Sequence, residues 1–173
     1  MLHIDVAIGI LEINGGVLFV RRAKHPYQGF LLLPGGKCEK GESFDEAIDR
    51  EILEETGLTV IEKTPVGYVE DTTITFHVPP YSHTAVYYRL KVSHADYRAG
   101  DEDLVLVPFD ELFHHEREMA PTNALILKDV YQNNAQSAYR TEVHEKEADI
   151  YVFISCQRIS FPSDVCNEIP LSA

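Results

Sequence analysis

The chain has 173 residues, of which 45% are hydrophobic, so it is long and apolar enough for one globular domain with its own core. Its formal net charge is −13, from 28 acidic and 15 basic residues. Such a surface binds nucleic acids and anionic membranes poorly, and we expect neither DNA binding nor membrane association. The chain has no signal-like N-terminus and no run of about 18 apolar residues, so we expect a cytoplasmic protein.

The cysteines give little indication of a cross-linked or metal-stabilised scaffold. The sequence contains Cys38, Cys156 and Cys166, which are odd in number and widely spaced. This usage argues against a disulfide framework or a zinc site.

The N-terminal part of the chain predicts strands joined by glycine turns. Residues 3–11 and 17–22 read as strands, and Asn14-Gly15-Gly16 between them is a strong hairpin turn. Residues 27–33 lead into a Pro-Gly-Gly turn at 34–36.

An amphipathic helix is predicted at about residues 43–56. Ser43 is a good N-cap with Glu46 three residues on, which is the pattern of a capping box. Gly57 is a natural C-terminal stop. Four apolar residues recur at helical spacing in this segment, namely Ala47, Ile48, Ile52 and Leu53.

The remainder of the chain predicts more strands and a second helix. Strands are expected at 58–61, 66–70, 73–78, 84–92 and 104–107, and a helix at 123–132 that starts near Pro121. Residues 138–144 and 149–157 are typical of a β-hairpin, and 162–173 of a loose tail. Strands with two helices predict an α/β protein, in which helices flank a mixed sheet.

Three carboxylates crowd one side of the helix predicted at 43–56, those of Glu51, Glu54 and Glu55. Like charges at this spacing weaken a helix and raise one another's proton affinity. The arrangement becomes favourable when a hard cation such as Mg²⁺ lies between the oxygens. The alternative is an ordinary solvated acidic face.

The loop before this helix favours the metal interpretation. Gly35 and Gly36 allow a carbonyl to approach a metal or phosphate closely, and Gly41 adds a second turn before the helix. A glycine-rich loop that leads into an acidic helix places backbone groups and carboxylates around one point. The sequence therefore predicts a metal–diphosphate site.

The segment from Gly36 to Leu58 has the spacing G-x5-E-x7-R-E-U-x-E-E-x-G-U, where U is a bulky aliphatic residue. This spacing resembles the signature of the Nudix hydrolases without any departure, and we call the segment from Gly36 to Leu58 the box. The resemblance covers about residues 3–133 and implies a Nudix-type α/β/α sandwich with a mixed β-sheet between helices. We expect a Nudix domain over 1–135 and a C-terminal extension over 136–173. This extension could cover the site, pair subunits in a homodimer or merely pack on the domain.

The resemblance implies metal-dependent hydrolysis of a nucleoside diphosphate linked to another group, with Mg²⁺ or Mn²⁺ as the cofactor. The metal would be held by the Gly35 carbonyl and by Glu51, Glu54 and Glu55. Arg50 would orient a glutamate, and Glu42 would brace the loop. Glu51 or Glu54 would be the base, with a downstream loop acid as the second choice. Glu102 is the first candidate for that acid, Asp101 and Asp103 are close alternatives, and an ordinary acidic turn stays open.

The resemblance implies a small nucleotide as the substrate, and the sequence leaves its class open between a nucleotide sugar such as ADP-ribose and a nucleoside triphosphate. Arg22, Tyr27 and Lys37 are the expected substrate-binding residues, although Arg22 could equally form a surface ion pair. Further candidates, each with a packing role as the alternative, are Phe30, Tyr81, His83 and Asn123.

Two other functions were weighed against hydrolysis. A non-catalytic Nudix-like nucleotide sensor is the main alternative, but every box residue is present here. Isomerisation of isopentenyl diphosphate would need a catalytic cysteine, and Cys38 is not convincingly placed for that role. The intact box favours the hydrolase.

Overall fold

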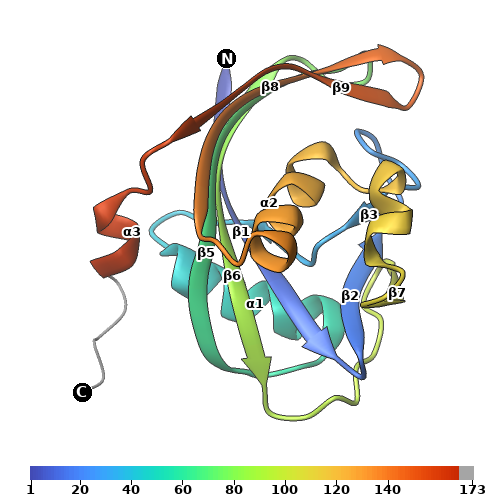
Figure 1. Ribbon diagram of the computed structural model, residues 1–173, viewed down its shortest axis with the longest axis vertical. Helices are drawn as coiled ribbons and strands as arrows, with labels where there is room; N and C mark the ends of the chain where they lie inside the picture. The colour runs from blue at the N-terminus through green and yellow to red at the C-terminus, as the bar shows by residue number, and fades with distance from the viewer. Residues whose placement is uncertain (168–173) are drawn as a thin grey trace.

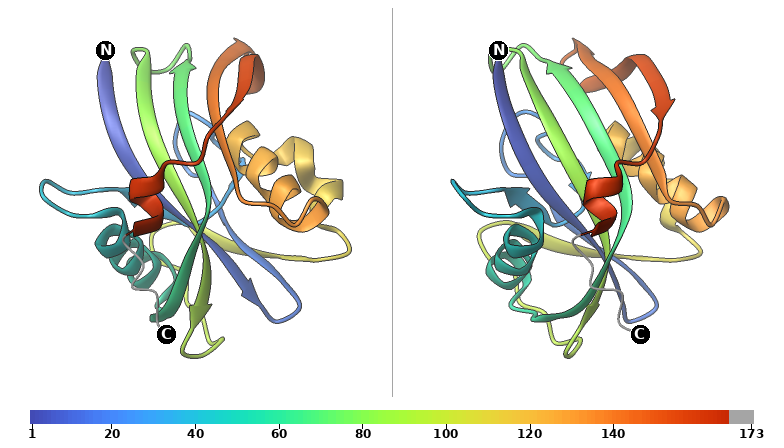
Figure 2. Two further views of the ribbon diagram at one scale, coloured as in Figure 1. Left: turned by 60° about the vertical axis from the view of Figure 1, so that its left-hand side comes forward. Right: turned by 90° about the vertical axis from the view of Figure 1, so that its left-hand side faces the viewer.

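The computed structural model describes residues 1–167. Its centre is a strongly curved sheet with helices on both faces (Figures 1 and 2). The elements are, in chain order, β1 (Leu2–Ile13), β2 (Gly16–Arg21), β3 (Leu31–Leu32), β4 (Gly35–Lys37), α1 (Phe44–Thr56), β5 (Val60–Ile74), β6 (Tyr81–Val92), β7 (Asp103–Pro108), the 3₁₀ helix η1 (Leu112–Glu118), α2 (Pro121–Gln132), β8 (Ser137–Glu147), β9 (Ile150–Ile159) and α3 (Ser163–Asn167).

The sheet is mixed. Its strand order is β3-β2-β1-β6-β5-β8-β9, with β4 paired to β1 and β7 paired to β2. The pairs β1–β6 and β5–β8 are parallel, whereas β5 and β6 run antiparallel. The expected α/β class, with a mixed sheet between helices, is confirmed.

Two apolar clusters hold the layers together, one on each face of the sheet. Successive strand residues point to opposite faces, so Tyr87 packs in the cluster with α2 and Tyr88 in the cluster with α1. From the helices, Ile126 enters the first cluster, and Ile48 and Ile52 enter the second. Each of these side chains is at most 1% exposed. The sheet thereby fixes where both helices lie.

The helix α1 begins and ends as predicted. The Ser43 hydroxyl accepts a bond from the Glu46 N–H at 3.2 Å, and the Glu46 carboxylate accepts from the Ser43 N–H at 2.9 Å. Gly57 closes the helix in the left-handed conformation with φ of 71°. This reciprocal capping fixes the point at which the loop enters the helix.

The prediction of three separate strands after α1 was wrong. The segments expected at 58–61, 66–70 and 73–78 are one strand, β5, which ends at Ile74. Pro65 and Gly67 broke the sequence pattern, but β-strand irregularities at these residues absorb them without interrupting the pairing with β6. The sequence reading also missed β4 and η1.

The C-terminal hairpin of β8 and β9 continues the central sheet, because β8 pairs with β5 from Gly67–Ser137 to Ile74–His144. A short helix, α3, follows at Ser163–Asn167, within the expected loose tail, and the rest of that tail lies outside the described residues. A boundary near residue 135 remains a sequence-based proposal. Within residues 1–167, no helix is both long and apolar enough to cross a membrane.

Candidate active site

The segment formed by β4, the following loop and α1 brings the box residues together. At Gly35 an added Cβ would lie 2.2 Å from the Ala7 carbonyl oxygen, so β4 packs directly on β1. At Gly36 it would lie 2.4 Å from the carboxyl carbon of Glu51. Only glycine allows the loop to approach both the sheet and the helix this closely.

Arg50 ties the helix to the loop. Its Nε and Nη2 atoms each donate to Glu42 at 2.8 Å, which is a bidentate pair, and Nη1 donates to Glu51 at 2.7 Å. Its Nη2 also donates to the Lys37 carbonyl at 3.0 Å. The hydrogen bonds from Arg50, together with that from the Glu39 N–H, lower the pKa of Glu42 to about 2. The hydrogen bonds to Glu42 and Glu51 raise the pKa of Arg50, so its guanidinium stays charged beside the ionised Glu42.

The side chain of Glu55, on α1, is half-buried against the start of β4. Its Oε2 accepts a bond from the Gly35 N–H at 2.9 Å. Burial raises its pKa to about 7, and the charges of Glu51 and Glu102 add to the rise, against the opposing effects of the Gly35 N–H and Arg22. A carboxyl group held in this state gains from a cation beside it.

Glu54 differs from the other two carboxylates in its exposure. Its side chain is 60% exposed, against 16% for Glu51. Its contact with the Arg50 Nη1 is long, at 3.5 Å. Of the three box carboxylates, Glu54 is thus the least restrained by protein partners.

The structure brings Glu102 to the box from a distant loop. The Arg98 N–H donates to the Thr56 carbonyl at 2.8 Å and the Gly100 N–H to the Glu55 carbonyl at 3.0 Å, so residues 93–102 pack on the end of α1. Glu102 Oε1 accepts from the Ala23 N–H at 2.8 Å, and its charge acts on Glu55. The neighbours Asp101 and Asp103 are exposed.

The three expected substrate-binding residues take different positions. The Arg22 guanidinium donates to the Pro26 carbonyl at 3.3 Å, and its charge acts on both Glu55 and Tyr81. Tyr27 packs against Tyr151, with ring centroids 4.1 Å apart, and burial raises the pKa of its phenol well above the ordinary value. The side chain of Lys37 is exposed, and its carbonyl serves Arg50.

A polar cluster on the sheet extends this region beyond the sequence prediction. Asp71 is 3% exposed and accepts bonds from the hydroxyls of Thr73, at 2.6 Å, and Thr141. His83 Nδ1 lies 3.7 Å from Asp71, and the Asp71 charge acts on Tyr81. Tyr81 and His83 were candidates from the sequence, but Asp71 was not. Asp71 and Thr73 are two residues apart on β5, so their side chains lie on the same face of the sheet.

Asn123 fits the packing alternative. Its Oδ1 accepts from the Leu33 N–H and its Nδ2 donates to the Tyr87 hydroxyl, each at 3.0 Å. Asn123 thus ties α2 to the segment before the Pro-Gly-Gly turn through Oδ1 and to β6 through Nδ2. Phe30 packs edge-on against Tyr151 with centroids 5.4 Å apart.

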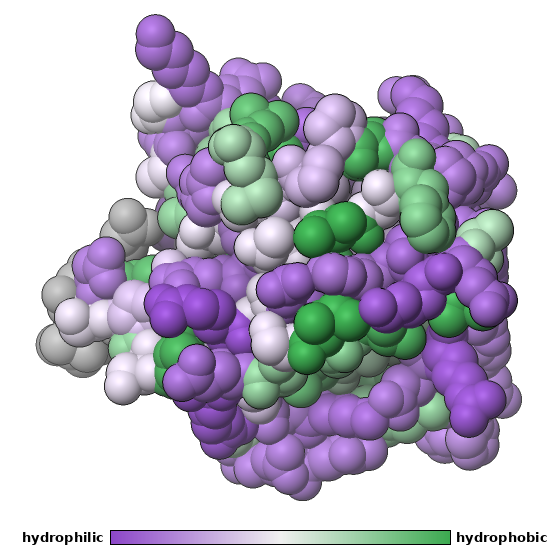
Figure 3. Space-filling model, turned by 90° about the horizontal axis from the view of Figure 1, so that it is seen from above, coloured by the Kyte–Doolittle hydropathy of each residue, from purple (hydrophilic) through white to green (hydrophobic). Residues whose placement is uncertain are grey.

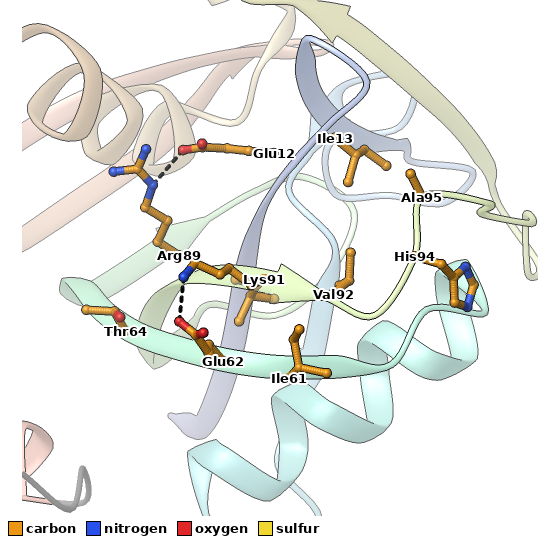
Figure 4. Close-up of a pocket in the computed structure, with 11 residues that line it drawn as sticks. Glu12, Ile13, Ile61, Glu62, Thr64, Arg89, Lys91, Val92, His94 and Ala95 are labelled. Carbon is orange, nitrogen blue, oxygen red and sulfur yellow. Dashed lines mark hydrogen bonds and ion pairs between the residues drawn. The ribbon is translucent and has the colours of Figure 1, made fainter. Parts of the chain in front are cut away.

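Two surface pockets lie in other parts of the fold. The one in Figure 4, of about 680 Å³, lies along β1, β5 and β6, and its charged side chains pair with each other: Arg89 with Glu12 at 2.6 Å and Lys91 with Glu62 at 2.7 Å. The other, of about 690 Å³, lies between α2 and β9. Because α1 lines neither pocket, neither is the box site.

The curved mixed sheet and the loop–helix unit with clustered carboxylates are the features expected of a Nudix-type protein. The sequence model of the NUDIX domain matches residues 1–130, and the chain belongs to this family. The resemblance found in the box is therefore confirmed.

Two curated proteins are similar to this chain over part of their length. A protein named ADP-ribose pyrophosphatase from Methanocaldococcus jannaschii is 36% identical over 103 residues, which are 58% of this chain and 59% of that protein. A protein named 8-oxo-dGTP diphosphatase from Escherichia coli K12 is 38% identical over 61 residues, 34% of this chain and 47% of that protein. The chain thus spans about half the length of these relatives. Both carry names of hydrolytic enzymes, so the alternative of a non-catalytic sensor is not supported.

The fold is shared with solved structures at low identity. The crystal structure of a MutT protein from Bacillus halodurans superposes with a TM-score of 0.72 at 21% identity and covers 92% of this chain and 99% of its own. This coverage extends past residue 130, where the match to the family model ends. At this identity it supports the fold alone.

Proposed function

We propose that this protein is a metal-dependent hydrolase that cleaves the diphosphate linkage of a nucleoside diphosphate joined to another group. The observation that carries the proposal is the convergence of Glu51, Glu54 and Glu55 with the glycine loop, while Glu102 approaches Glu55 from a separate segment. The chain's membership of the NUDIX family, whose members generally use divalent metal ions, supports it.

The donor set fits Mg²⁺ or Mn²⁺. Three carboxylates and the Gly35 carbonyl offer only oxygen atoms, which these hard ions prefer. Glu55 in particular has a raised pKa and a single backbone partner, so a cation beside it would stabilise its carboxylate. When bound, such an ion neutralises the charge that develops on the phosphate oxygens.

The protein's own groups have separable roles in this proposal. Glu54, the most exposed of the three carboxylates, is our first candidate for the base that takes the proton of the attacking water, with Glu51 beside it. Arg50 positions Glu51 and, through Glu42, the loop. Glu102 is the alternative base, because it is held near Glu55 by the Ala23 N–H.

The proposed substrate-binding surface extends from the box residues to Arg22 and Tyr27. The charge of Arg22 acts on Glu55 and on Tyr81, so it lies between the carboxylates and the aromatic side chains. A cation there suits a phosphate, and Tyr27 offers a ring that a base or sugar could pack against. Exposed Lys37 could add positive charge at the loop.

We also propose that the protein is cytoplasmic and that it can form a homodimer.

Among substrate classes we place nucleotide sugars such as ADP-ribose first. The relative named ADP-ribose pyrophosphatase matches a longer part of this chain than the relative named 8-oxo-dGTP diphosphatase. Nucleoside triphosphates, including oxidised ones, are the second class.

The decisive experiment measures product mass and phosphate or pyrophosphate release from a panel of ADP-ribose, other nucleotide sugars, dinucleoside polyphosphates and nucleoside triphosphates in Mg²⁺. We expect one class to be turned over, and Glu54→Gln to reduce turnover by about 100-fold or more without loss of fold. The matched control is Glu111→Gln, because Glu111 is exposed and distant from the box in sequence. Equal rates in both variants would remove Glu54 from the mechanism.

Removal of the metal tests the other half of the proposal. EDTA should abolish turnover, and added Mg²⁺ or Mn²⁺ should restore it, because the oxygen donors alone leave the phosphate charge unneutralised. Turnover that persists after complete demetallation would contradict the assignment of the carboxylates as metal ligands.

A further inference from the structure

Three segments that are far apart in the sequence meet at the end of the sheet remote from α1 (Figures 1 and 2). They are the loop between β2 and β3, the connection between β5 and β6, and the turn between β8 and β9. Each contributes one metal-binding type of side chain, and the potential ligand atoms of His25, His77 and Asp149 lie within 4.8 Å of one another. Figure 3, which views this end from above, shows a largely hydrophilic surface with separate apolar patches.

The ring of His25 has an unsatisfied nitrogen at this point. Its Nδ1 atom is buried and has no hydrogen-bond partner among the described residues. The nearest acidic oxygen, Asp149 Oδ1, is 3.7 Å away, which is too far for a hydrogen bond. A buried nitrogen without a partner costs free energy. A cation between this nitrogen and the Asp149 carboxylate would satisfy both groups.

The ring of His77 is oriented by a buried carboxylate. Its Nε2 lies 3.1 Å from Glu145 Oε1, and the Glu145 side chain is fully buried. Glu145 also accepts bonds from the N–H groups of Phe76, at 2.9 Å, and Asp149, at 3.1 Å. A proton on Nε2 directed at Glu145 leaves Nδ1 of His77 free to bind a metal. Metal-binding histidines commonly have such an outer carboxylate.

The two imidazole rings are held against each other. Their centroids are 3.6 Å apart and their planes differ by 15°. The side chains of His25, His77 and Asp149 are 34%, 31% and 47% exposed, so solvent and ions have access. A tetrahedral ion with bonds of about 2.0–2.1 Å separates its ligand atoms by about 3.4 Å. Because an imidazole binds a metal in its own ring plane, one of the two stacked rings would turn out of the stack when the ion binds.

We propose that His25, His77 and Asp149 form a second metal site, separate from the box, whose first candidate ion is Zn²⁺. Two imidazoles and one carboxylate suit Zn²⁺, whereas Mg²⁺ prefers oxygen atoms alone. Glu145 orients His77, and water fills the remaining position. Cysteine spacing argued against zinc, but this site uses histidine and aspartate from three loops, which no local spacing reveals.

The proposed ion would order the loop that carries the candidate substrate residues. His25 lies in the same loop as Arg22 and Tyr27, and the Tyr27 N–H donates to the Tyr151 hydroxyl at 3.0 Å. An ion bound to His25, His77 and Asp149 would fasten this loop to the hairpin. This consequence depends on the proposed function, whereas the binding of the ion does not.

Metal binding is tested on the full chain after removal of metals, with Mg²⁺ present in excess to occupy the box. We expect one Zn²⁺ per chain by competition with a chromogenic chelator, and Co²⁺ to give the visible absorption of a low-coordinate nitrogen–oxygen site. His25→Ala and His77→Ala should each weaken Zn²⁺ binding by more than about 100-fold. Glu145→Gln should weaken it by about 10–100-fold, as an outer partner does.

The controls separate this site from the box and from nonspecific histidines. His115→Ala removes a histidine that pairs with Glu118 elsewhere on the surface, and it should bind Zn²⁺ as the unaltered protein does. Glu54→Gln should also retain binding. If Glu54→Gln loses the ion, or if His25→Ala and His77→Ala keep it, the proposal is wrong.

The stability of each variant shows whether a loss of binding reflects unfolding. Without metal, His25→Ala and His77→Ala should melt within a few degrees of the unaltered protein, and Zn²⁺ should raise the melting temperature only of proteins that retain the site. A rise of equal size in His77→Ala would overturn the assignment. Turnover of the box substrate in Mg²⁺ is measured separately, so failure of one proposal leaves the other distinguishable.

Discussion

Arg50 is the side chain on which the arrangement of the box carboxylates depends most directly. It contacts Glu42 through two nitrogens and Glu51 through a third, and it also binds the Lys37 carbonyl. A lysine ammonium would keep the charge but could not reproduce this planar set of donors. The resemblance to the Nudix signature implied a contact with a glutamate, while the double contact with Glu42 became visible only in the structure.

We predict that Arg50→Lys lowers kcat/KM by about 100-fold, because Glu51 and the loop would shift from their positions. The measurement is steady-state kinetics on the substrate that the panel identifies, with circular dichroism to confirm the fold. Arg117→Lys, at an exposed position in η1, is the control. Equal kinetics for both variants would show that the guanidinium geometry is dispensable.

The raised pKa of Glu55 predicts a pH dependence of the metal-free protein. Its folded-state pKa is about 7, above the ordinary 4.5, so the folded state holds this proton more tightly than the unfolded state. Stability from this group is present below about pH 4.5 and is lost as the pH rises to about 7. The full loss is on the order of 3 kcal/mol.

The test compares chemical unfolding of the metal-free protein and of Glu55→Gln between pH 4.5 and 8. The difference between the two free energies of unfolding should change from pH 4.5 to about 7 and level off towards pH 8. Glu42, whose pKa is lowered to about 2, acts in the opposite direction and only at lower pH. A flat difference would show that Glu55 titrates normally.

At the level of the elements, the position of α1 relative to β4 decides whether the box can form. The contact is so close that a methyl group at Gly36 would overlap the carboxyl group of Glu51. The helix itself was predictable from its cap, its apolar spacing and Gly57. The strand β4 was not, because a three-residue strand of Gly-Gly-Lys has no β-propensity and exists only through its pairing with β1.

We predict that Gly36→Ala displaces the Glu51 carboxylate and lowers turnover by about 100-fold while the helix remains folded. Gly15→Ala is the matched control: it introduces strain at a φ of 80°, but its added methyl group has no neighbour within 4 Å. It should reduce stability and leave kcat unchanged. A Gly36→Ala variant with full turnover would mean that Glu51 tolerates movement.

For the molecule as a whole, the hairpin of β8 and β9 is part of the sheet that supports the site. Val143 and Tyr139 on β8 are 0% and 8% exposed, and the Tyr139 hydroxyl donates to Asp129 on α2 at 2.5 Å. Removing the hairpin would expose the edge of β5 together with this packing surface.

We therefore predict that a chain ending at residue 135 aggregates or loses cooperative thermal unfolding. The measurement is size-exclusion chromatography with a thermal melt, and a chain ending at residue 160, which keeps both strands, is the control. A chain of residues 1–135 that melts as the longer one does would establish the hairpin as an independent extension.

The sequence by itself determined the family, the α/β class, the limits of α1 and the identity of the clustered carboxylates. These depend on local spacing, since helix periodicity, capping and the glycine loop act within about 25 residues of chain. They could be read without knowing which strands pair.

The tertiary structure alone decided what meets across the sheet. Pairing with β6 and β8 made β5 one strand, packing of residues 93–102 on α1 brought Glu102 to Glu55, and three separate loops placed His25 beside His77 and Asp149. Such contacts depend on strand order and register, which are set by long-range packing. No local pattern in the chain carries that information.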